Sequence, residues 1–305
     1  MSASAQGRAV ESSCGSLSWS GHAMAYDSDR RLVVAVGGVS DGDSSTAATW
    51  GWDGKAWRCV APAGSTSPQP RNAAVLAYDA TRHALVLYGG RRERTALRDT
   101  WELTAGGWSR KDSAGPTPEP HGVMAFDPST HNVLLYHTVG DDGPERGTWG
   151  WNGQQWRRLA SEPNAVIPDA MFGALGAHRT ALLTVHPTDA PDSFEATWYA
   201  WSGSRWKERA LRGTPPRFSP QAPAARTRTG AIVFAGFEPG GVVRMWSLEG
   251  ESCRAYAGPM PSVRRGTAMA FDASRGVVVL HGGDDGKRLL DDTWEWDGRR
   301  WRKIR

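Results

Sequence analysis

The stretch Asp292-Thr-Trp-Glu-Trp-Asp-Gly298, followed by Arg300-Trp-Arg-Lys-Ile304, decides how this chain of 305 residues folds. Its Thr-Trp pair recurs along the chain, and Met245 replaces the Thr in one copy. The Trp residues stand at positions 50, 101, 149, 198, 246 and 294, at intervals of 51, 48, 49, 48 and 48 residues. A period of about fifty residues over a whole chain indicates one supersecondary unit that is copied and stacked. We therefore predict the fold from the repeat and the function from positions where the copies differ.

Each repeat contains four short strand-like runs, here named A to D in chain order. In the last repeat they are Thr267–Asp272, Gly276–Gly283, Asp292–Asp297 and Arg300–Ile304. The runs are rich in β-branched and aromatic residues and are separated by Asp, Gly and Ser. An Asp-Gly or Asn-Gly pair between runs C and D predicts a tight hairpin, because Gly accepts the positive φ of such turns. No segment has a helical period, so an all-β chain is expected.

Six four-stranded units can avoid open edges by arranging themselves radially. We therefore expect a six-bladed β-propeller with four antiparallel strands per blade, each blade formed by contiguous sequence. The predicted blades span approximately residues 18–66, 67–116, 117–165, 166–216, 217–260 and 261–305. Residues 1–17 are rich in Ser, Ala and Gly. They are expected to form an N-terminal tail that is disordered or adds a closing strand.

The repeat resembles the kelch repeat, in which strand B ends in a double glycine and strand D carries a Trp. The double glycines are Gly37-Gly38, Gly89-Gly90 and Gly282-Gly283, and the strand D residues are Trp57, Trp108, Trp156, Trp206 and Trp301. The resemblance covers residues 18–305 and is strongest to bacterial kelch-like proteins. It implies a propeller, but leaves function open: kelch propellers include partner-binding modules, sugar oxidases, sugar mutarotases and iron-dependent lyases.

The composition excludes several classes of partner. Fifteen of the 16 Trp residues occupy periodic positions in runs C and D, so we interpret them as wedges between blades; Trp19 is the exception. The net charge is +4 and the basic residues are scattered, which argues against a nucleic-acid partner. No stretch approaches eighteen apolar residues, so no membrane partner is expected.

The cysteines and the N-terminus favour a cytoplasmic protein. Cys14, Cys59 and Cys253 are odd in number, irregularly spaced and without a CxxC pair, which suggests a reducing compartment or simple packing. Cys253 occupies the strand D Trp position of the fifth repeat and is predicted to lie in the core. The first twenty residues contain no apolar segment typical of a signal peptide.

The two faces of the predicted ring differ in loop length. The A–B and C–D turns are tight and share one face. The B–C and D–A connections are long and share the other, which we call the long-loop face. Because long loops on a rigid scaffold concentrate function, we predict the site at the mouth of the central channel on the long-loop face.

The double-glycine position changes in three consecutive repeats. Repeat three has His137, repeat four has His186, and repeat five has Phe237 after a single glycine. These exchanges either place chemistry on one side of the channel or reflect degenerate copies. If the protein is an enzyme, His137 and His186 would transfer protons, His121 would assist, and Phe237 would form an apolar wall.

Further binding candidates lie where strand A begins and just before the double-glycine position. They are His22, Arg71, Asn72, Met171, Gln221 and Arg265 in the first group, and Tyr88, Tyr136 and His281 in the second. The kelch resemblance implies that Arg71, Asn72 and Arg265 read acidic or polar peptides; the alternative is that they are ordinary solvent-facing residues. The two Tyr and His281 either extend the site inward or are buried and satisfied by the backbone.

No cofactor is predicted and no metal ligands are assigned. A divalent metal would need several of His22, His121, His137 and His186, together with a carboxylate from Asp141, Asp142, Glu195 or Asp284. None of these residues has the local spacing of a metal site. The Glu, Asp and His loop of the lyases and a suitably placed Cys for the oxidases are also missing.

Two functional hypotheses follow. In the first, the propeller binds a small molecule or a partner peptide at the long-loop mouth. In the second, it is an enzyme that acts on a small metabolite as an isomerase, lyase or cyclase through His general acid–base chemistry.

Overall fold

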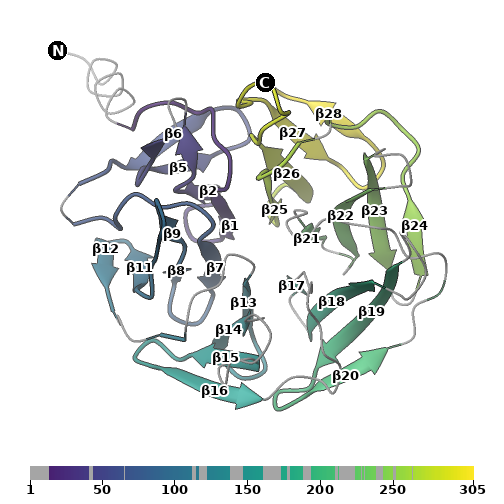
Figure 1. The fold of residues 1–305 in the computed structure, drawn as a ribbon, viewed down its shortest axis with the longest axis horizontal. Helices are drawn as coiled ribbons and strands as arrows, with labels where there is room; N and C mark the ends of the chain where they lie inside the picture. The colour runs from purple at the N-terminus through teal and green to yellow at the C-terminus, as the bar shows by residue number, and fades with distance from the viewer. Residues whose placement is uncertain are drawn as a thin grey trace.

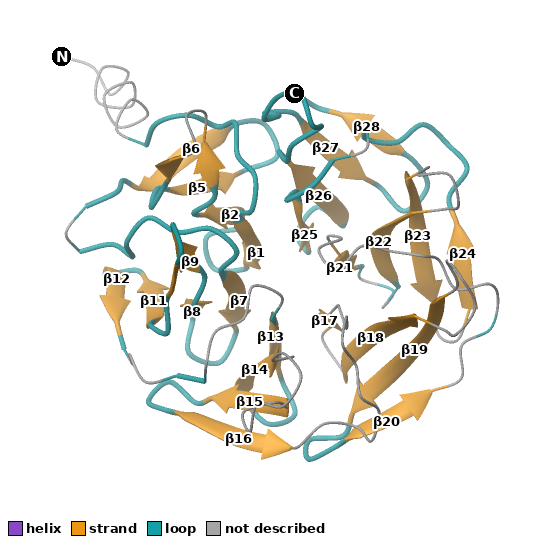
Figure 2. Ribbon diagram, viewed as in Figure 1, coloured by secondary structure: helices purple, strands orange, loops and turns teal. Residues whose placement is uncertain are grey.

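The computed structural model describes most of the chain. The described residues are 14–40, 44–64, 66–111, 115–116, 122–137, 147–160, 173–176, 179–187, 194–209, 212, 224–227, 229, 231–237, 243–249, 252–262 and 264–305. For residues 137, 173–176, 179–187, 194–196, 226, 232, 234–237 and 243 only the backbone is described. Within these ranges the chain is all-β and contains no helix, as predicted (Figure 2).

The described strands form six four-stranded antiparallel sheets, one for each sequence repeat. Sheet one contains β1 (Ala23–Asp27), β2 (Leu32–Val36), β5 (Thr49–Trp52) and β6 (Trp57–Ala61). Sheet two contains β7 (Val75–Asp79), β8 (Ala84–Tyr88), β11 (Thr100–Thr104) and β12 (Gly107–Arg110). Sheet three contains β13 (Val123–Asp127), β14 (Asn132–His137), β15 (Gly147–Trp151) and β16 (Trp156–Ala160).

The remaining three sheets follow the same strand order. Sheet four contains β17 (Gly173–Gly176), β18 (Arg179–Pro187), β19 (Phe194–Trp201) and β20 (Trp206–Arg209). Sheet five contains β21 (Ala224–Arg226), β22 (Ile232–Phe237), β23 (Val243–Glu249) and β24 (Ser252–Ala255). Sheet six contains β25 (Ala268–Asp272), β26 (Val277–His281), β27 (Thr293–Trp296) and β28 (Trp301–Lys303).

The first strand of each sheet lies nearest the centre, and the sheets are arranged around it (Figure 1). Neighbouring first strands contact one another in the order β1, β7, β13, β17, β21, β25, and β25 also contacts β1. None of these sheets combines strands from two repeats within the described residues. This arrangement is consistent with a β-propeller-like fold, and sheets one and six meet without sharing a strand.

The repeated Trp and Thr residues join adjacent sheets. The indole N–H of a strand D Trp donates to the hydroxyl of the Thr in the Thr-Trp pair of the preceding sheet. The donor–acceptor pairs are Trp57–Thr293 at 2.9 Å, Trp108–Thr49 at 2.9 Å, Trp156–Thr100 at 2.8 Å and Trp206–Thr148 at 2.6 Å. At Trp301 the preceding sheet carries Met245, and the buried indole nitrogen has no partner among the described residues. The other strand D Trp residues, interpreted as wedges between blades, therefore also form a specific hydrogen bond with the neighbouring sheet.

Replacing Thr49 by Val should cost about 1–3 kcal/mol of unfolding free energy, because the buried Trp108 N–H would lose its acceptor in a side chain of nearly equal shape. Urea denaturation measures this difference. Thr49→Ser is the matched control, since it keeps the hydroxyl. A Val variant as stable as the Ser variant would contradict the assigned role.

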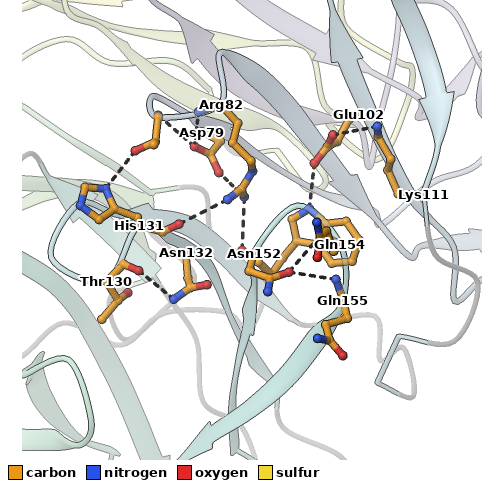
Figure 3. A network of polar contacts seen from close by, with 12 residues as sticks. Asp79, Arg82, Glu102, Lys111, Thr130, His131, Asn132, Asn152, Gln154 and Gln155 are labelled. Atoms are coloured by element: carbon orange, nitrogen blue, oxygen red, sulfur yellow. Dashed lines mark hydrogen bonds and ion pairs between the residues drawn. The ribbon is translucent and has the colours of Figure 1, made fainter.

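Polar contacts between sheets also cover the tight-turn face. In the A–B turns, buried aspartates accept hydrogen bonds from turn amides, as Asp79 Oδ1 does from the Thr81 and Arg82 amides at 2.9 Å each. Arg82 then reaches sheet three, where it donates to the carbonyls of His131 and Trp151 at 3.3 Å. Figure 3 shows this network, which continues through Glu102 to Lys111. These contacts fix the A–B turn of sheet two and join sheets two and three on this face.

The N-terminal segment is packed from residue 14 onward. Cys14 is buried and forms a disulfide bond with Cys59 of β6. This bond corrects the sequence interpretation of these two cysteines as unpaired thiols. Cys253 is a buried free thiol in β24, as predicted for a core substitution. Residues 14–17, assigned to the tail, are thus part of the packed structure, while residues 1–13 lie outside the described residues.

Among the described residues, no helix is long and apolar enough to cross a membrane.

Candidate functional site: the rim of the long-loop face

Two short ribbons extend from the B–C connections. They are β3 (Val39–Ser40) with β4 (Ser44–Ser45) in sheet one, and β9 (Arg91–Arg92) with β10 (Thr95–Ala96) in sheet two. In sheets one, two and six, the residue three positions before the first strand pairs with the start of the B–C connection of the same sheet. The backbone bridges are Ser20–Val39, Asn72–Arg91 and Arg265–Asp284. Sheets one, two and six therefore hold the residue at this position by the same backbone bridge on the long-loop face.

Backbone hydrogen bonds connect these positions from sheet to sheet. The Ala73 amide donates to the Gly21 carbonyl at 2.8 Å, and the Gly21 amide donates to the Gly266 carbonyl at 2.7 Å. All three residues have positive φ, of 72° at Gly21, 52° at Ala73 and 60° at Gly266. Left-handed backbone is favourable for Gly and costs energy for Ala, so this shared conformation explains the two glycines.

The side chains that precede these three residues form what we call the rim arc: Ser20, Asn72 and Arg265. Ser20 and Asn72 are half-buried, and Arg265 is exposed. The Ser20 hydroxyl donates to the Arg265 carbonyl at 3.4 Å, which places the two residues next to each other. A hydroxyl, an amide and a guanidinium group thus occupy equivalent positions of three adjacent sheets.

Arg71, one residue before Asn72, has a structural role. It is fully buried, and its guanidinium forms a bidentate pair with Asp99 at 2.7 and 2.8 Å and also donates to the Gly89 carbonyl at 2.9 Å. Burial alone would raise the pKa of Asp99, but the hydrogen bonds and charge of Arg71 lower it. The predicted ligand contact of Arg71 is therefore replaced by a contact within sheet two.

Sheet six contains the same Arg–Asp pair, whereas sheet one has apolar residues at the two corresponding positions. Arg264 forms the same bidentate pair with Asp292. In sheet one, Trp19 and Ala48 stand at the corresponding positions, and both are buried. A superposition of the copies on their Thr-Trp pairs could have found this exchange, because Ala48, Asp99 and Asp292 each directly precede the Thr.

Trp19, His22 and His281 form a buried cluster where sheets one and six meet, here called the closure cluster. The ring centroids are 5.6 Å apart for Trp19–His22, 5.7 Å for Trp19–His281 and 5.8 Å for His22–His281. His281 Nε2 lies 3.0 Å from the Leu17 carbonyl and Nδ1 lies 3.0 Å from the Thr293 hydroxyl. Since the Leu17 carbonyl can only accept, Nε2 carries the proton and Nδ1 accepts from Thr293.

The two imidazoles of the closure cluster are held in the neutral form. Burial, assisted by the nearby His281, lowers the pKa of His22 to about 3. Neither ring nitrogen of His22 bonds to a described residue. Burial also lowers the pKa of His281 to about 4, although its bond to Leu17 acts in the opposite direction. Groups with these values are poorly matched to acid–base catalysis near pH 7, so we interpret both buried histidines as packing residues.

The two tyrosine candidates are buried as well. The Tyr88 hydroxyl donates to the Pro116 carbonyl, and its ring centroid lies 4.9 Å from that of Trp156. Tyr136 packs edge-on against Trp206 at 6.0 Å. For Tyr88 the buried, backbone-satisfied alternative is the one found.

The corresponding positions of sheets three, four and five are described only in part. His137 ends β14 opposite Gly147, His186 pairs with Glu195 between β18 and β19, and Phe237 ends β22. Their side chains lie outside the described residues, as do His121, Met171, Gln221, Asp141 and Asp142 entirely. Asp284 accepts from the Gly286 amide at 2.7 Å. Within the described part of the chain, no three His, Cys, Asp or Glu side chains gather as metal ligands.

A pocket of about 310 Å³ lies beside the Arg71–Asp99 pair and is separate from the rim arc. It is lined by Gln69, Ala96, Leu97, Arg98, Asp99, Trp101 and Arg110. Arg98 donates two hydrogen bonds to the Gly115 carbonyl, and Asp99 is already neutralised by Arg71. Since its polar groups mainly hold loops, the rim arc remains the better candidate site.

No protein-family model matches this sequence.

Proposed function

We propose that this chain is a six-bladed kelch-like β-propeller that binds a small molecule or a partner peptide at the long-loop mouth, through the rim arc. The arrangement of the six sheets and the contact of β25 with β1 support the propeller. The observation that carries the binding function is the chain of peptide hydrogen bonds from Ala73 to Gly21 to Gly266. It aligns three polar side chains on the long-loop face.

The chemistry of the rim arc favours an acidic or strongly polar ligand group. Arg265 offers a planar guanidinium suited to a carboxylate or phosphate. Asn72 can both donate and accept, and Ser20 can rotate its hydroxyl to suit the ligand. The fixed backbone beneath them limits the entropy lost on binding. The enzyme hypothesis depends on His137 and His186, whose side chains lie outside the described residues, so binding is the function we propose.

A thermal-shift screen against carboxylates, phosphorylated metabolites, acidic peptides and divalent metals tests the proposal. A ligand that raises the Tm of the unmodified protein should bind at least about tenfold more weakly to Arg265→Ala, because a charge-assisted hydrogen bond contributes roughly 1.5–3 kcal/mol. Asn72→Ala should weaken binding less. Isothermal titration calorimetry measures both changes.

Arg299→Ala is the matched control. Arg299 is also exposed, but it lies in the C–D turn of sheet six on the tight-turn face. It should leave the affinity unchanged. If Arg265→Ala and Arg299→Ala weaken a ligand equally, or if neither rim substitution affects it, the rim arc is not the binding site.

A further inference from the structure

Residues 14–20, which we call the strap, lie across the junction between sheets one and six. Trp19 is almost completely buried, in a cluster that contains Trp50 and Trp57 of sheet one and Val279 of sheet six. Figure 1 shows that these two sheets, from opposite ends of the chain, lie side by side. The strap therefore covers the place where a ring of contiguous sheets has to close.

Hydrogen bonds attach the inner end of the strap to both sheets. The Trp19 carbonyl accepts from the Gly283 amide at 2.7 Å, and the Leu17 carbonyl accepts from His281. Ser20 exchanges two backbone bonds with Val39, at 2.8 and 3.1 Å. The strap thus connects sheet six to sheet one in addition to the contacts between their strands.

The outer end of the strap is fixed covalently. Cys14 is bonded to Cys59, which lies 45 residues away in the outermost strand of sheet one. Cys14 is buried and Cys59 is half-buried. An incoming thiolate therefore has better access to the Cys59 sulfur, and Cys14 is the sulfur that would leave.

We propose that Cys14 and Cys59 are a redox modification site that locks the strap over the junction, with a thiol–disulfide compound as its exchange partner. When the Cys14–Cys59 bond forms, the Cys59 thiolate attacks the disulfide of the exchange partner, here called the donor, and releases one donor thiol. The Cys14 thiolate then attacks the Cys59 sulfur and releases the second. Two electrons pass from the cysteines to the donor disulfide, and the two protons end on the donor thiols.

The third cysteine does not compete for this pairing. Cys253 lies in sheet five, and burial raises the pKa of its thiol to about 11. Since the thiolate is the reactive form, a buried thiol of high pKa exchanges slowly. The oxidised form persists where thiols are not kept reduced, so the redox state of this site depends on the compartment that holds the protein.

Comparison of one sample in two redox states tests the proposal without a mutation. The unmodified protein is oxidised with glutathione disulfide, or reduced with a phosphine, and its Tm is measured. The oxidised form should melt roughly 3–6 °C higher, because the bond constrains a long loop of the unfolded chain. Alkylation after denaturation should label one thiol in the oxidised form and three in the reduced form.

Cysteine variants and hydrogen exchange distinguish a specific effect of the disulfide on the strap from a general effect of reduction on stability. Cys14→Ser and Cys59→Ser should each lose the redox dependence of the Tm, whereas Cys253→Ser should keep it. Reduction should also speed exchange of the Gly283 amide, which bonds to Trp19, more than that of strand amides in sheet two. A Tm that does not change on reduction, or three thiols labelled after oxidation, would overturn the proposal.

Discussion

Acidification from pH 6.5 to pH 4 is expected to lower the free energy of unfolding by several kcal/mol. The folded pKa values of His22 and His281 are about 3 and about 4, below the value of ~6.5 expected in the unfolded chain. Between these limits the unfolded state binds more protons than the folded state, so stability is greatest above pH 6.5 and is lost as the pH falls. Each imidazole contributes ~1.4 kcal/mol per pH unit in this window. Urea denaturation at a series of pH values measures the slope.

His22→Ala isolates one of the two contributions. The corresponding residue in sheet two is Ala74, so the site can accept a small side chain. The variant should lose about half of the pH dependence, whatever its stability at neutral pH. An unaltered slope in His22→Ala would show that this imidazole is not buried at the junction.

Arg71→Ala is expected to destabilise the fold by about 3–5 kcal/mol. It leaves the Asp99 carboxylate mostly buried, without the two hydrogen bonds it receives from Arg71. The Gly89 carbonyl also loses a donor. Chemical denaturation measures the loss, and the exposed Arg92→Ala in the neighbouring ribbon is the control, with an expected change within about 0.5 kcal/mol.

The double variant Arg71→Met with Asp99→Ala should be more stable than Arg71→Ala alone. Removing both charges avoids an unpaired buried carboxylate, and an apolar pair occupies this place in sheet one as Trp19 and Ala48. The Trp101 indole would lose its bond to Asp99, as Trp50 in sheet one already lacks a partner among the described residues. Additive losses in a double-mutant cycle would contradict a direct coupling of the two groups.

Comparison of the repeats distinguishes residues that stabilise the fold from residues that can contact a ligand. Arg71 and Arg264 occupy the same place in two sheets and make the same ion pair, so their recurrence has a structural cause. Ser20, Asn72 and Arg265 also share one position but differ in chemistry, and their backbones are fixed by the same bonds. Variation on a constant scaffold is typical of binding positions, and it is the reason to test the rim arc first.

The sequence by itself determined the elements and their order. The spacing of the Thr-Trp pairs, the Asp-Gly turns and the β-branched runs depend on local conformational preferences, which one chain displays directly; the six sheets match the six repeats. It also predicted that Cys253 is buried, because position within a repeat implies burial.

Only the tertiary structure decided how distant residues are used. Arg71 pairs with Asp99, 28 residues away, and Cys14 pairs with Cys59, 45 residues away, and both contacts depend on tertiary packing. The packing of Trp19 with His22 and His281 joins the two ends of the chain. These contacts join residues that are far apart in the chain, and the spacing of the repeats alone does not say which of their side chains meet.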